Sequence, residues 1–382
     1  MRSDAGDCSV VVLLDLSSAF DTVDHGILIE RLGQWVGVTG TALQWFSSYL
    51  SDRSCAVSVG NFASSSEPLR CGVPQGSVLG PILFALYLLP LGQIINQFKG
   101  VSYHCYADDI QLYFSFSPRN IASLSALSDC VTAIKNWMAN NFLQLNSDKT
   151  EFLISAPPSL VPRIKDGLCL HTSMIKPSVK ILGVTVDHAL TLDQHVKLLI
   201  SSCFFQLRNI AKLRPIVSQA EMEILIHAFG SSRLDYCNSL FTFVSKTSLD
   251  RLQVVQNAAA RLLTRTPRRS HITPILSALH WLPIKSRIQY KILVVTYRAL
   301  HGQAPLYITD LLQPYVTSRS LRSSDQGLLV VPRSRLKTKG DRAFEVVAPT
   351  LWNSLPVNLR SADTVDSFKK QLKTHLYSLA FL

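Results

Sequence analysis

Two adjacent carboxylates, Asp108 and Asp109, stand at the tip of a predicted β-hairpin. The residues before and after them, about 101–107 and 110–114, alternate in the manner of two strands. Two like charges side by side are costly to bury unless a cation neutralises them, yet aspartate is also a common turn residue. The segment therefore predicts a hairpin whose tip is either a metal site or an ordinary acidic turn.

A third carboxylate follows a buried strand near the start of the chain. Residues 9–14 form a short, β-branched apolar run that predicts this strand, and Asp15 comes directly after it. A carboxylate in that position is poorly solvated, so we expect it to have a partner. Small residues and one bulky aromatic, Phe20, come next. We expect Asp24 to cap a helix and Asp21 to be structural as well.

A loop rich in glycine and proline spans residues 72–81. Its three glycines and two prolines fix an unusual backbone, and glycine lets a backbone approach a ligand closely. Gln75 and Gly76 lie in the middle of this rigid loop, where the glutamine amide can donate and accept hydrogen bonds. Taken alone, the pattern favours an ordinary turn before a buried helix over residues 82–89.

In this order, the segments resemble the palm of a reverse transcriptase. The residues of the motifs are most similar to those of non-LTR (LINE-type) retrotransposons. The resemblance is strong over about residues 8–190 and looser beyond. Five segments match the five palm motifs in order: Asp15 with Phe20, the Pro-Gln-Gly sequence of 74–76, the Tyr-Ala-Asp-Asp sequence of 106–109, residues 143–150, and the primer-gripping residues 181–184.

The resemblance implies an RNA-directed DNA polymerase that uses an RNA template, a DNA primer and deoxynucleoside triphosphates. Transfer to a primer 3′-hydroxyl is served by two metal ions about 3.5–4 Å apart, and the resemblance implies two Mg²⁺ ions, with Mn²⁺ as the alternative. It makes Asp15 and Asp108 metal ligands and catalytic residues, with Asp109 as the third carboxylate of the cluster. Hard carboxylate oxygens suit Mg²⁺.

The same resemblance implies roles for the neighbouring side chains. Phe20 would be the steric gate against a ribose 2′-hydroxyl, and Gln75 with Gly76 would contact the incoming nucleotide and template. Lys149 would lie near the leaving pyrophosphate, although a solvated lysine beside Asp148 is an equal alternative.

Charge is distributed unevenly along the 382 residues. Residues 1–150 carry a net charge of −4 and residues 151–382 one of +16, for a formal total of +12. An acidic half followed by a basic half suits a polymerase palm with a thumb that grips nucleic acid. Taken alone, a basic surface is weak evidence, because many soluble proteins are basic.

We therefore predict a mixed α/β (α+β) chain in three parts. A palm with an antiparallel sheet and packed helices covers residues 1–190. A mainly helical, thumb-like region covers 191–310, and a basic C-terminal region of unknown role covers 311–382. In the third region, basic residues recur at close spacing: Arg333, Arg335, Lys337, Lys339 and Arg342.

Within the helical region, Ser248 is expected to cap a helix that carries one apolar face. The apolar face is formed by Leu249, Leu252, Val255, Ala259 and Leu262. Four arginines near the end of this helix are candidates for phosphate contact, and a solvated basic face is the equal alternative. They are Arg261, Arg265, Arg268 and Arg269.

The cysteine spacing and the hydropathy of the sequence indicate the cellular compartment of the protein. The eight scattered cysteines form no Cys-x-x-Cys pair, which indicates a reducing compartment without a disulfide framework or zinc knuckle. LINE-type proteins often carry such a knuckle near the C-terminus, but the last cysteine here is Cys237. Residues 71–98 are uncharged, yet only 82–89 are unbroken, short of the ~20 residues of a membrane span. We expect an intracellular protein, without a signal peptide and not secreted.

Two other functions are left open by the sequence. The predicted palm begins at about residue 9, so we expect no fingers or endonuclease before it, and independent polymerase activity is not assured. One alternative is a non-catalytic, nucleic-acid-binding relic of a reverse transcriptase that uses only the basic half. The other is a different metal-dependent phosphoryl-transfer enzyme, which does not explain Phe20 or the loop at 74–76. The oligomeric state is not indicated.

Overall fold

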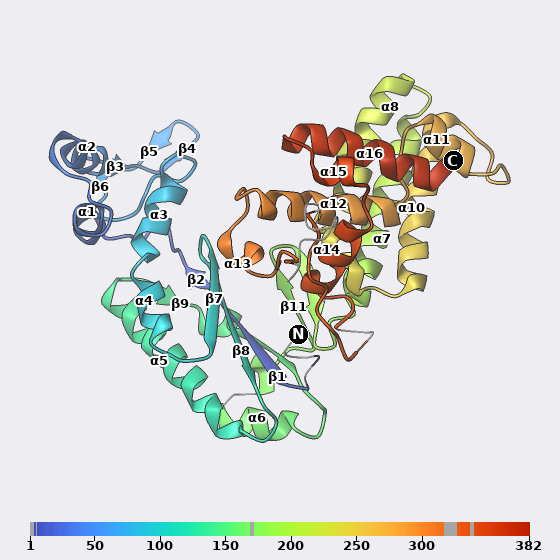
Figure 1. Ribbon diagram of the computed structural model, residues 1–382. Coiled ribbons are helices and arrows are strands. Elements are labelled where there is room, and N and C mark those ends of the chain that lie inside the picture. The colour runs from blue at the N-terminus through green and yellow to red at the C-terminus, as the bar shows by residue number, and fades with distance from the viewer. Residues whose placement is uncertain (1–3, 5, 169–171, 317–326, 337–339) are drawn as a thin grey trace. The chain divides into compact units, whose positions relative to one another are not determined.

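The computed structural model describes residues 4, 6–168, 172–316, 327–336 and 340–382 (Figure 1). The chain divides into two compact units, which we call the N-terminal unit, residues 6–179, and the helical unit, residues 180–382 with Asp4. Each unit has its own hydrophobic core.

The N-terminal unit is built on a four-stranded sheet in the order β10–β1–β8–β7, and every neighbouring pair is antiparallel. These strands are β1 (Cys8–Leu14), β7 (Val101–Tyr106), β8 (Asp109–Phe116) and β10 (Glu151–Ser155). Alternate side chains of β1 are buried, as the two-residue period of a strand requires. The expected mixed fold with an antiparallel sheet is confirmed.

Six helices accompany this sheet in the described part of the unit. They are α1 (His25–Gln34), α2 (Gly40–Leu50), α3 (Gly80–Leu88), α4 (Leu91–Asn96), α5 (Leu124–Asn140) and α6 (Val161–Gly167). Asp24 caps α1, because its carboxylate accepts a hydrogen bond from the N–H of Ile27 at 2.9 Å, which confirms the predicted cap. Helix α5 buries one apolar stripe and packs on α4 and β7 (Figure 1).

Short strands and turns complete the N-terminal unit. The paired short strands are β2 (Leu16–Ser17) with β9 (Gln144–Leu145), β3 (Ser54–Cys55) with β6 (Glu67–Pro68), and β4 (Ser58–Val59) with β5 (Phe62–Ala63). The 3₁₀ turns are Ile121–Ser123, Ser147–Lys149 and Thr172–Met174.

The buried guanidinium of Arg31 connects α1 with α3 and with the C-terminal end of α5, which Asn141 caps. Arg31 of α1 is 7% exposed, and its guanidinium donates to the carbonyl of Tyr87 in α3 and to the side chain of Asn141. The same guanidinium lies over the Tyr87 ring, 4.3 Å from its centroid. Burial lowers the pKa of Arg31, and acceptors on both sides satisfy its donors, as a buried charge requires.

The helical unit begins within a β-hairpin and continues almost entirely as helices. The hairpin strands are β11 (Ser178–Ile181) and β12 (Val184–Asp187), and the unit boundary falls within β11. The helices are α7 (Asp193–Leu213), α8 (Gln219–Ile226), a π-helical turn (His227–Ser231), α9 (Ser232–Asp235), a 3₁₀ segment (Asn238–Phe243), α10 (Lys246–Thr264), α11 (Thr273–Ala278), α12 (Ile284–Leu300), α13 (Leu306–Thr309), α14 (Phe344–Asn353), α15 (Val357–Arg360) and α16 (Val365–Phe381).

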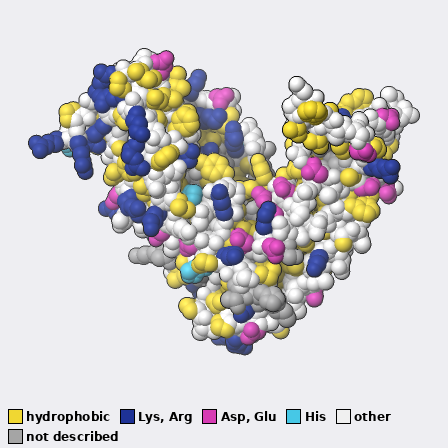
Figure 2. Space-filling view, turned by 180° about the vertical axis from the view of Figure 1, so that it is seen from behind, with side chains coloured by type: hydrophobic (Ala, Val, Ile, Leu, Met, Phe, Trp, Pro, Cys, Tyr) yellow, Lys and Arg dark blue, Asp and Glu magenta, His cyan; other side chains and the backbone are white. Residues whose placement is uncertain are grey.

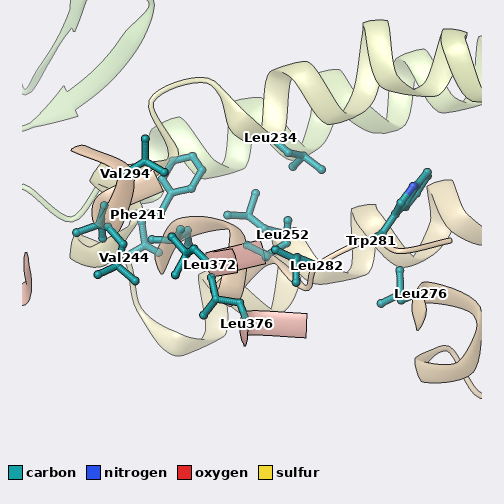
Figure 3. Packing of buried hydrophobic residues seen from close by; sticks show 14 of the residues in the cluster. Leu234, Phe241, Val244, Leu252, Leu276, Trp281, Leu282, Val294, Leu372 and Leu376 are labelled. Atoms are coloured by element: carbon teal, nitrogen blue, oxygen red, sulfur yellow. The ribbon is translucent and has the colours of Figure 1, made fainter. Parts of the chain in front are cut away.

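The core of this unit is apolar and aromatic (Figure 3). Tyr297 of α12 stacks on Phe368 of α16 with ring centroids 4.4 Å apart, and Trp352 of α14 lies 5.8 Å from Phe368. The Trp352 indole N–H donates to the carbonyl of Gly327 at 2.8 Å. Residues 344–381 therefore pack on α12 in one core.

The predicted helix cap at Ser248 is wrong. Helix α10 is capped by Ser245, whose hydroxyl accepts from the N–H of Ser248 at 3.2 Å. Ser245 and Ser248 do not differ in residue type, so their neighbours decide between them. Val244, before Ser245, is buried, and Leu249 packs on the same core. These are the two positions of a hydrophobic staple around a cap at Ser245. Ser248 lies inside the helix, where it donates to Asp193 of α7 at 2.9 Å.

Candidate active site

Strand register brings three carboxylates to one end of the N-terminal sheet. Strand β1 ends at Leu14, which pairs with Ile110 of β8, and continuing this register by one residue sets Asp15 opposite Asp109. Strands β7 and β8 are joined by a two-residue turn in which Ala107 has a φ of +53° and Asp108 follows. The hairpin predicted around Asp108 and Asp109 is present, and Asp15 lies beside it.

The carboxylates influence one another electrostatically. The side chain of Asp109 is exposed, and its pKa is raised above its ordinary value, first by partial desolvation and then by the negative charges of Asp108 and Asp15. One oxygen of Asp15, Oδ2, is buried, and its partner is the Lys149 ammonium at 3.1 Å. The raised pKa of Asp109 is a feature that a nearby cation relieves.

Lys149 supplies a positive charge at this position. Its Nζ lies 3.1 Å from Asp15 Oδ2, an ion pair without hydrogen-bond geometry. The short β2–β9 pairing and a hydrogen bond of 2.8 Å from the N–H of Asn146 to the Asp15 carbonyl bring residues 146–149 beside Asp15. The Asn146 side chain also accepts from the N–H groups of Asp148 and Lys149. Lys149 therefore lies beside Asp15, while its side chain stays 67% exposed to solvent.

Among the described residues, no three or more His, Cys, Asp or Glu side chains are grouped so that they could hold a metal ion. The three carboxylates form an open arrangement. Such an arrangement suits Mg²⁺, which keeps water and substrate phosphates among its ligands and is bound through only one or two carboxylates. The donor set therefore fits a divalent cation that is completed by a phosphate-bearing substrate.

The glycine-rich loop packs against the segment that follows Asp15. The N–H of Val73 donates to the carbonyl of Phe20, and that of Gly72 to the carbonyl of Val23, both at 2.8 Å. Gly72 has a φ of +91°, and a Cβ there would lie 3.1 Å from the Asp21 carbonyl oxygen. Only glycine therefore permits this approach.

Gln75 and Asp21 form a direct contact that sequence reasoning missed. The Gln75 amide donates from Nε2 to Asp21 Oδ1 at 2.8 Å. Gly76 next to it has a φ of +78°. The contact agrees with the expectation that Asp21 is structural, and the residue that its carboxylate holds is a candidate substrate-binding residue. No local pattern signals a contact across 54 positions.

Phe20 lies half-buried against the second turn of α3. Its ring stacks on that of Phe84, with centroids 4.7 Å apart and planes 26° apart. Phe84 is fully buried. The packing fixes the orientation of the Phe20 ring, so it presents a defined edge beside the loop of residues 72–81.

The four candidate arginines lie at the C-terminal end of α10. Arg261 donates to the carbonyl of Ser270 at 3.2 Å, and Arg265 is the exposed C-cap with a φ of +57°. Arg268 and Arg269 are exposed in the turn that follows. Arg261 is therefore partly engaged within the fold, whereas the other three present their side chains to solvent.

Other basic residues of the C-terminal region are partly held by the fold. The Arg342 guanidinium donates to the carbonyl of Phe243 at 2.5 Å, and the backbone N–H of Arg335 donates to the carboxylate of Asp4 at 2.8 Å. Lys337 and Lys339 lie outside the described residues. Figure 2 shows many Lys and Arg side chains over the face of the helical unit that it presents.

The uncharged stretch over residues 71–98 forms the loop, α3 and α4. In the part of the chain that the structure describes, each helix is too short or too polar to cross a bilayer.

Comparisons with known proteins agree with these motifs. Residues 2–186 match the family described as reverse transcriptase (RNA-dependent DNA polymerase). The probable RNA-directed DNA polymerase from transposon BS of Drosophila melanogaster is 30% identical over 67% of this chain and 29% of its own length. The RNA-directed DNA polymerase from mobile element jockey of the same species is 24% identical over 68% of this chain and 29% of its own length.

Among solved structures, an apo telomerase from Candida tropicalis, truncated from its C-terminal domain, aligns with a TM-score of 0.36 and 13% identity. That alignment covers 47% of this chain and 34% of the telomerase chain. The present chain spans about 29% of the length of the curated relatives it matches. Residues 2–186 therefore match the reverse transcriptase family, and the chain is similar to RNA-directed DNA polymerases of non-LTR retrotransposons.

Proposed function

We propose that this domain extends a DNA primer on an RNA template with deoxynucleoside triphosphates. The observation that carries the proposal is the assembly of Asp15, Asp108 and Asp109 at one end of the sheet by the register of β1 and β8. The ordered match of residues 2–186 to the reverse transcriptase family supports the choice of reaction. The loop that positions Gln75 beside Asp21 supports it as well.

Reverse transcriptases generally use divalent metal ions. In this domain the residues that would hold them are Asp15, Asp108 and Asp109, and we propose two Mg²⁺ ions, with Mn²⁺ as the alternative. Bound ions of this kind activate the attacking hydroxyl and stabilise the charge on the leaving group. The position of Asp15 opposite Asp109 in the register of β1 and β8 and the raised pKa of Asp109 support this assignment.

Lys149 has two successive partners in this proposal. Without substrate, its ammonium neutralises Asp15 at 3.1 Å. In the presence of a triphosphate, the exposed ammonium of Lys149 would stabilise the negative charge on the leaving pyrophosphate. The flexible lysine stem and the exposed ammonium permit this second contact.

Two further side chains act on the incoming nucleotide. The Phe20 ring, fixed by its stacking on Phe84, excludes a ribose 2′-hydroxyl by occupying its space. Gln75 offers its amide to the nucleotide and template strand, and Asp21 fixes the direction of that amide. In the helical unit, Arg261, Arg265, Arg268 and Arg269 contact nucleic-acid phosphates.

The test is extension of a labelled DNA primer on an RNA template by the purified chain. We expect Mg²⁺-dependent addition of deoxynucleotides that is abolished in Asp108→Ala. Asp129→Asn, which removes an exposed carboxylate from α5, is the matched control and should extend normally. Extension that persists in Asp108→Ala would contradict the assigned site.

A second candidate function is nucleic-acid binding without catalysis. The net charge of +16 over residues 151–382 favours it, because basic surfaces bind nucleic acid regardless of chemistry. It predicts no extension by the wild type, together with salt-sensitive RNA binding that Asp15→Ala and Asp108→Ala leave unchanged. The same two assays therefore separate the candidates.

A further inference from the structure

The turn between β11 and β12 has an unusual backbone. It consists of Leu182 and Gly183, and both residues have a positive φ, +44° and +85°. Type I′ hairpin turns have this pattern, and they prefer asparagine followed by glycine. Leucine rarely adopts the left-handed region, because its Cβ crowds the following carbonyl oxygen. Such residues persist only where surrounding contacts hold them, and they are concentrated at functional sites.

Tyr236 makes the contact that holds this turn. Its hydroxyl donates to the carbonyl of Leu182 at 2.5 Å, from a position 54 residues further along the chain. Its ring lies against Gly183, where a Cβ would be 3.4 Å from Tyr236 Cε1. The Leu182 carbonyl belongs to the peptide that joins the two turn residues. The hydroxyl therefore fixes the orientation of that peptide, and the ring limits its movement.

Helix α7 supports both partners of this contact. It packs on β12 and on α9, the short helix that Tyr236 ends. The N–H of Thr185 in β12 donates to His195 Nδ1 of α7 at 3.3 Å. Arg233 of α9 donates to Ser202 Oγ of α7 at 2.8 Å. The turn and the tyrosine are therefore attached to the same helix, and all of these residues belong to the helical unit.

An open cavity of about 560 Å³ borders the turn. Gly183 and Tyr236 line it, together with the exposed side chains of Lys180 and Arg233, and its described lining residues include no carboxylate. This side of the turn therefore carries positive charge, which suits the phosphates of a nucleic-acid strand. The charge indicates the class of ligand, whereas the held turn supplies a fixed surface.

We propose that Tyr236 is a positioning residue for the primer. It holds the turn at 182–183 in the left-handed conformation, so that the turn presents one fixed backbone surface to the primer strand. The tyrosine acts through the turn and makes no contact of its own with the primer. This inference rests on the proposed function, because the primer-gripping role of residues 181–184 comes from their resemblance to the fifth palm motif, inside the matched residues 2–186.

The test is binding of a labelled DNA primer annealed to an RNA template, measured by fluorescence anisotropy. It uses the Asp108→Ala chain without divalent ions, so that no extension takes place. Tyr236→Phe removes the hydroxyl and keeps the ring. We expect it to weaken duplex binding roughly fivefold, the effect of one hydrogen bond. Tyr315→Phe, which changes an exposed tyrosine of the same unit outside the cavity, is the matched control and should bind as before.

A double-mutant cycle separates an action through the turn from a direct contact with nucleic acid. Leu182→Asn gives the turn a residue type that adopts the left-handed conformation readily. The turn then depends less on Tyr236, so Tyr236→Phe should weaken binding less than about twofold in the Leu182→Asn chain. An equal loss in both backgrounds would mean that the hydroxyl contacts the nucleic acid itself.

Two further readouts separate positioning from a general loss of stability. Amides of residues 183–185 should exchange hydrogen faster in Tyr236→Phe and normally in Tyr315→Phe. In the chain with Asp108 intact, the KM for primer–template should rise roughly fivefold in Tyr236→Phe, while the KM for deoxynucleoside triphosphates stays unchanged. A chain that is merely less stable would not separate the two constants.

Two results overturn the proposal. One is equal duplex binding by the Tyr236→Phe and Tyr315→Phe chains, and the other is an equal loss in both backgrounds of the cycle. A wild type that binds the duplex without extending it would contradict the proposed polymerase reaction, yet the effect of Tyr236 on binding would still be measured. Failure of the wild type to bind the duplex would contradict both.

Discussion

At the scale of single residues, Asp109 connects the geometry of the sheet to a measurable titration. Its pKa is raised by partial desolvation and by the charges of Asp108 and Asp15. A proton therefore competes with a metal ion for this carboxylate at a higher pH than for an ordinary aspartate. Since the ion binds the ionised form, metal affinity should be full above the raised pKa and should fall as pH drops through it.

Asp108→Asn removes one of the causes of that shift, so we expect the pKa of Asp109 to move back toward its ordinary value. Addition of Mg²⁺ to the wild type should lower it as well. Carbon-detected NMR of the aspartate carboxyl groups measures both effects. Asp129→Asn should leave Asp109 unmoved, and a pKa of Asp109 that is indifferent to Asp108 would contradict the placement of the two carboxylates.

At the scale of elements, the Asp21–Gln75 hydrogen bond joins the glycine-rich loop to the segment after β1. Asp21→Ala removes the acceptor and frees the amide, at a cost of about 1 kcal/mol, the net worth of one hydrogen bond. If Gln75 binds the nucleotide, KM for deoxynucleoside triphosphates should rise roughly fivefold. Asp21→Asn keeps Oδ1 as an acceptor and should restore the wild-type value.

Hydrogen exchange of the loop gives a readout independent of activity. Amides of residues 74–77 should exchange faster in Asp21→Ala and normally in Asp21→Asn. If both variants behave like the wild type in exchange and KM, Asp21 has no positioning role.

Strands, turns and helix caps were predictable from sequence where the residues that determine them lie within a few positions of one another. A short apolar, β-branched run predicted β1, alternation predicted the β7–β8 hairpin, and the turn chemistry before α1 predicted the cap by Asp24. The contact of Lys149 with Asp15 depends on a two-residue pairing of distant strands, which leaves no periodic trace. Ser245 and Ser248 are alike as caps, and only the burial of Val244 decides between them.

At the scale of the whole molecule, the charge of the second half predicts how nucleic-acid binding depends on salt. Each phosphate contact to a single strand releases condensed ions and contributes about −0.7 to the slope of log affinity against log salt. Arg268 and Arg269 are both exposed. Replacing both with glutamine should therefore make the slope for single-stranded RNA shallower by about 1.4.

The same measurement distinguishes a localised contact from diffuse attraction. Replacing Arg119 and Lys135, two exposed basic residues of the N-terminal unit, with glutamine removes equal charge and serves as the control. If both double variants change the slope equally, binding follows net charge alone and the end of α10 is an ordinary solvated face. A change confined to the α10 variant would make these arginines phosphate ligands, because counterion release counts contacts rather than total charge.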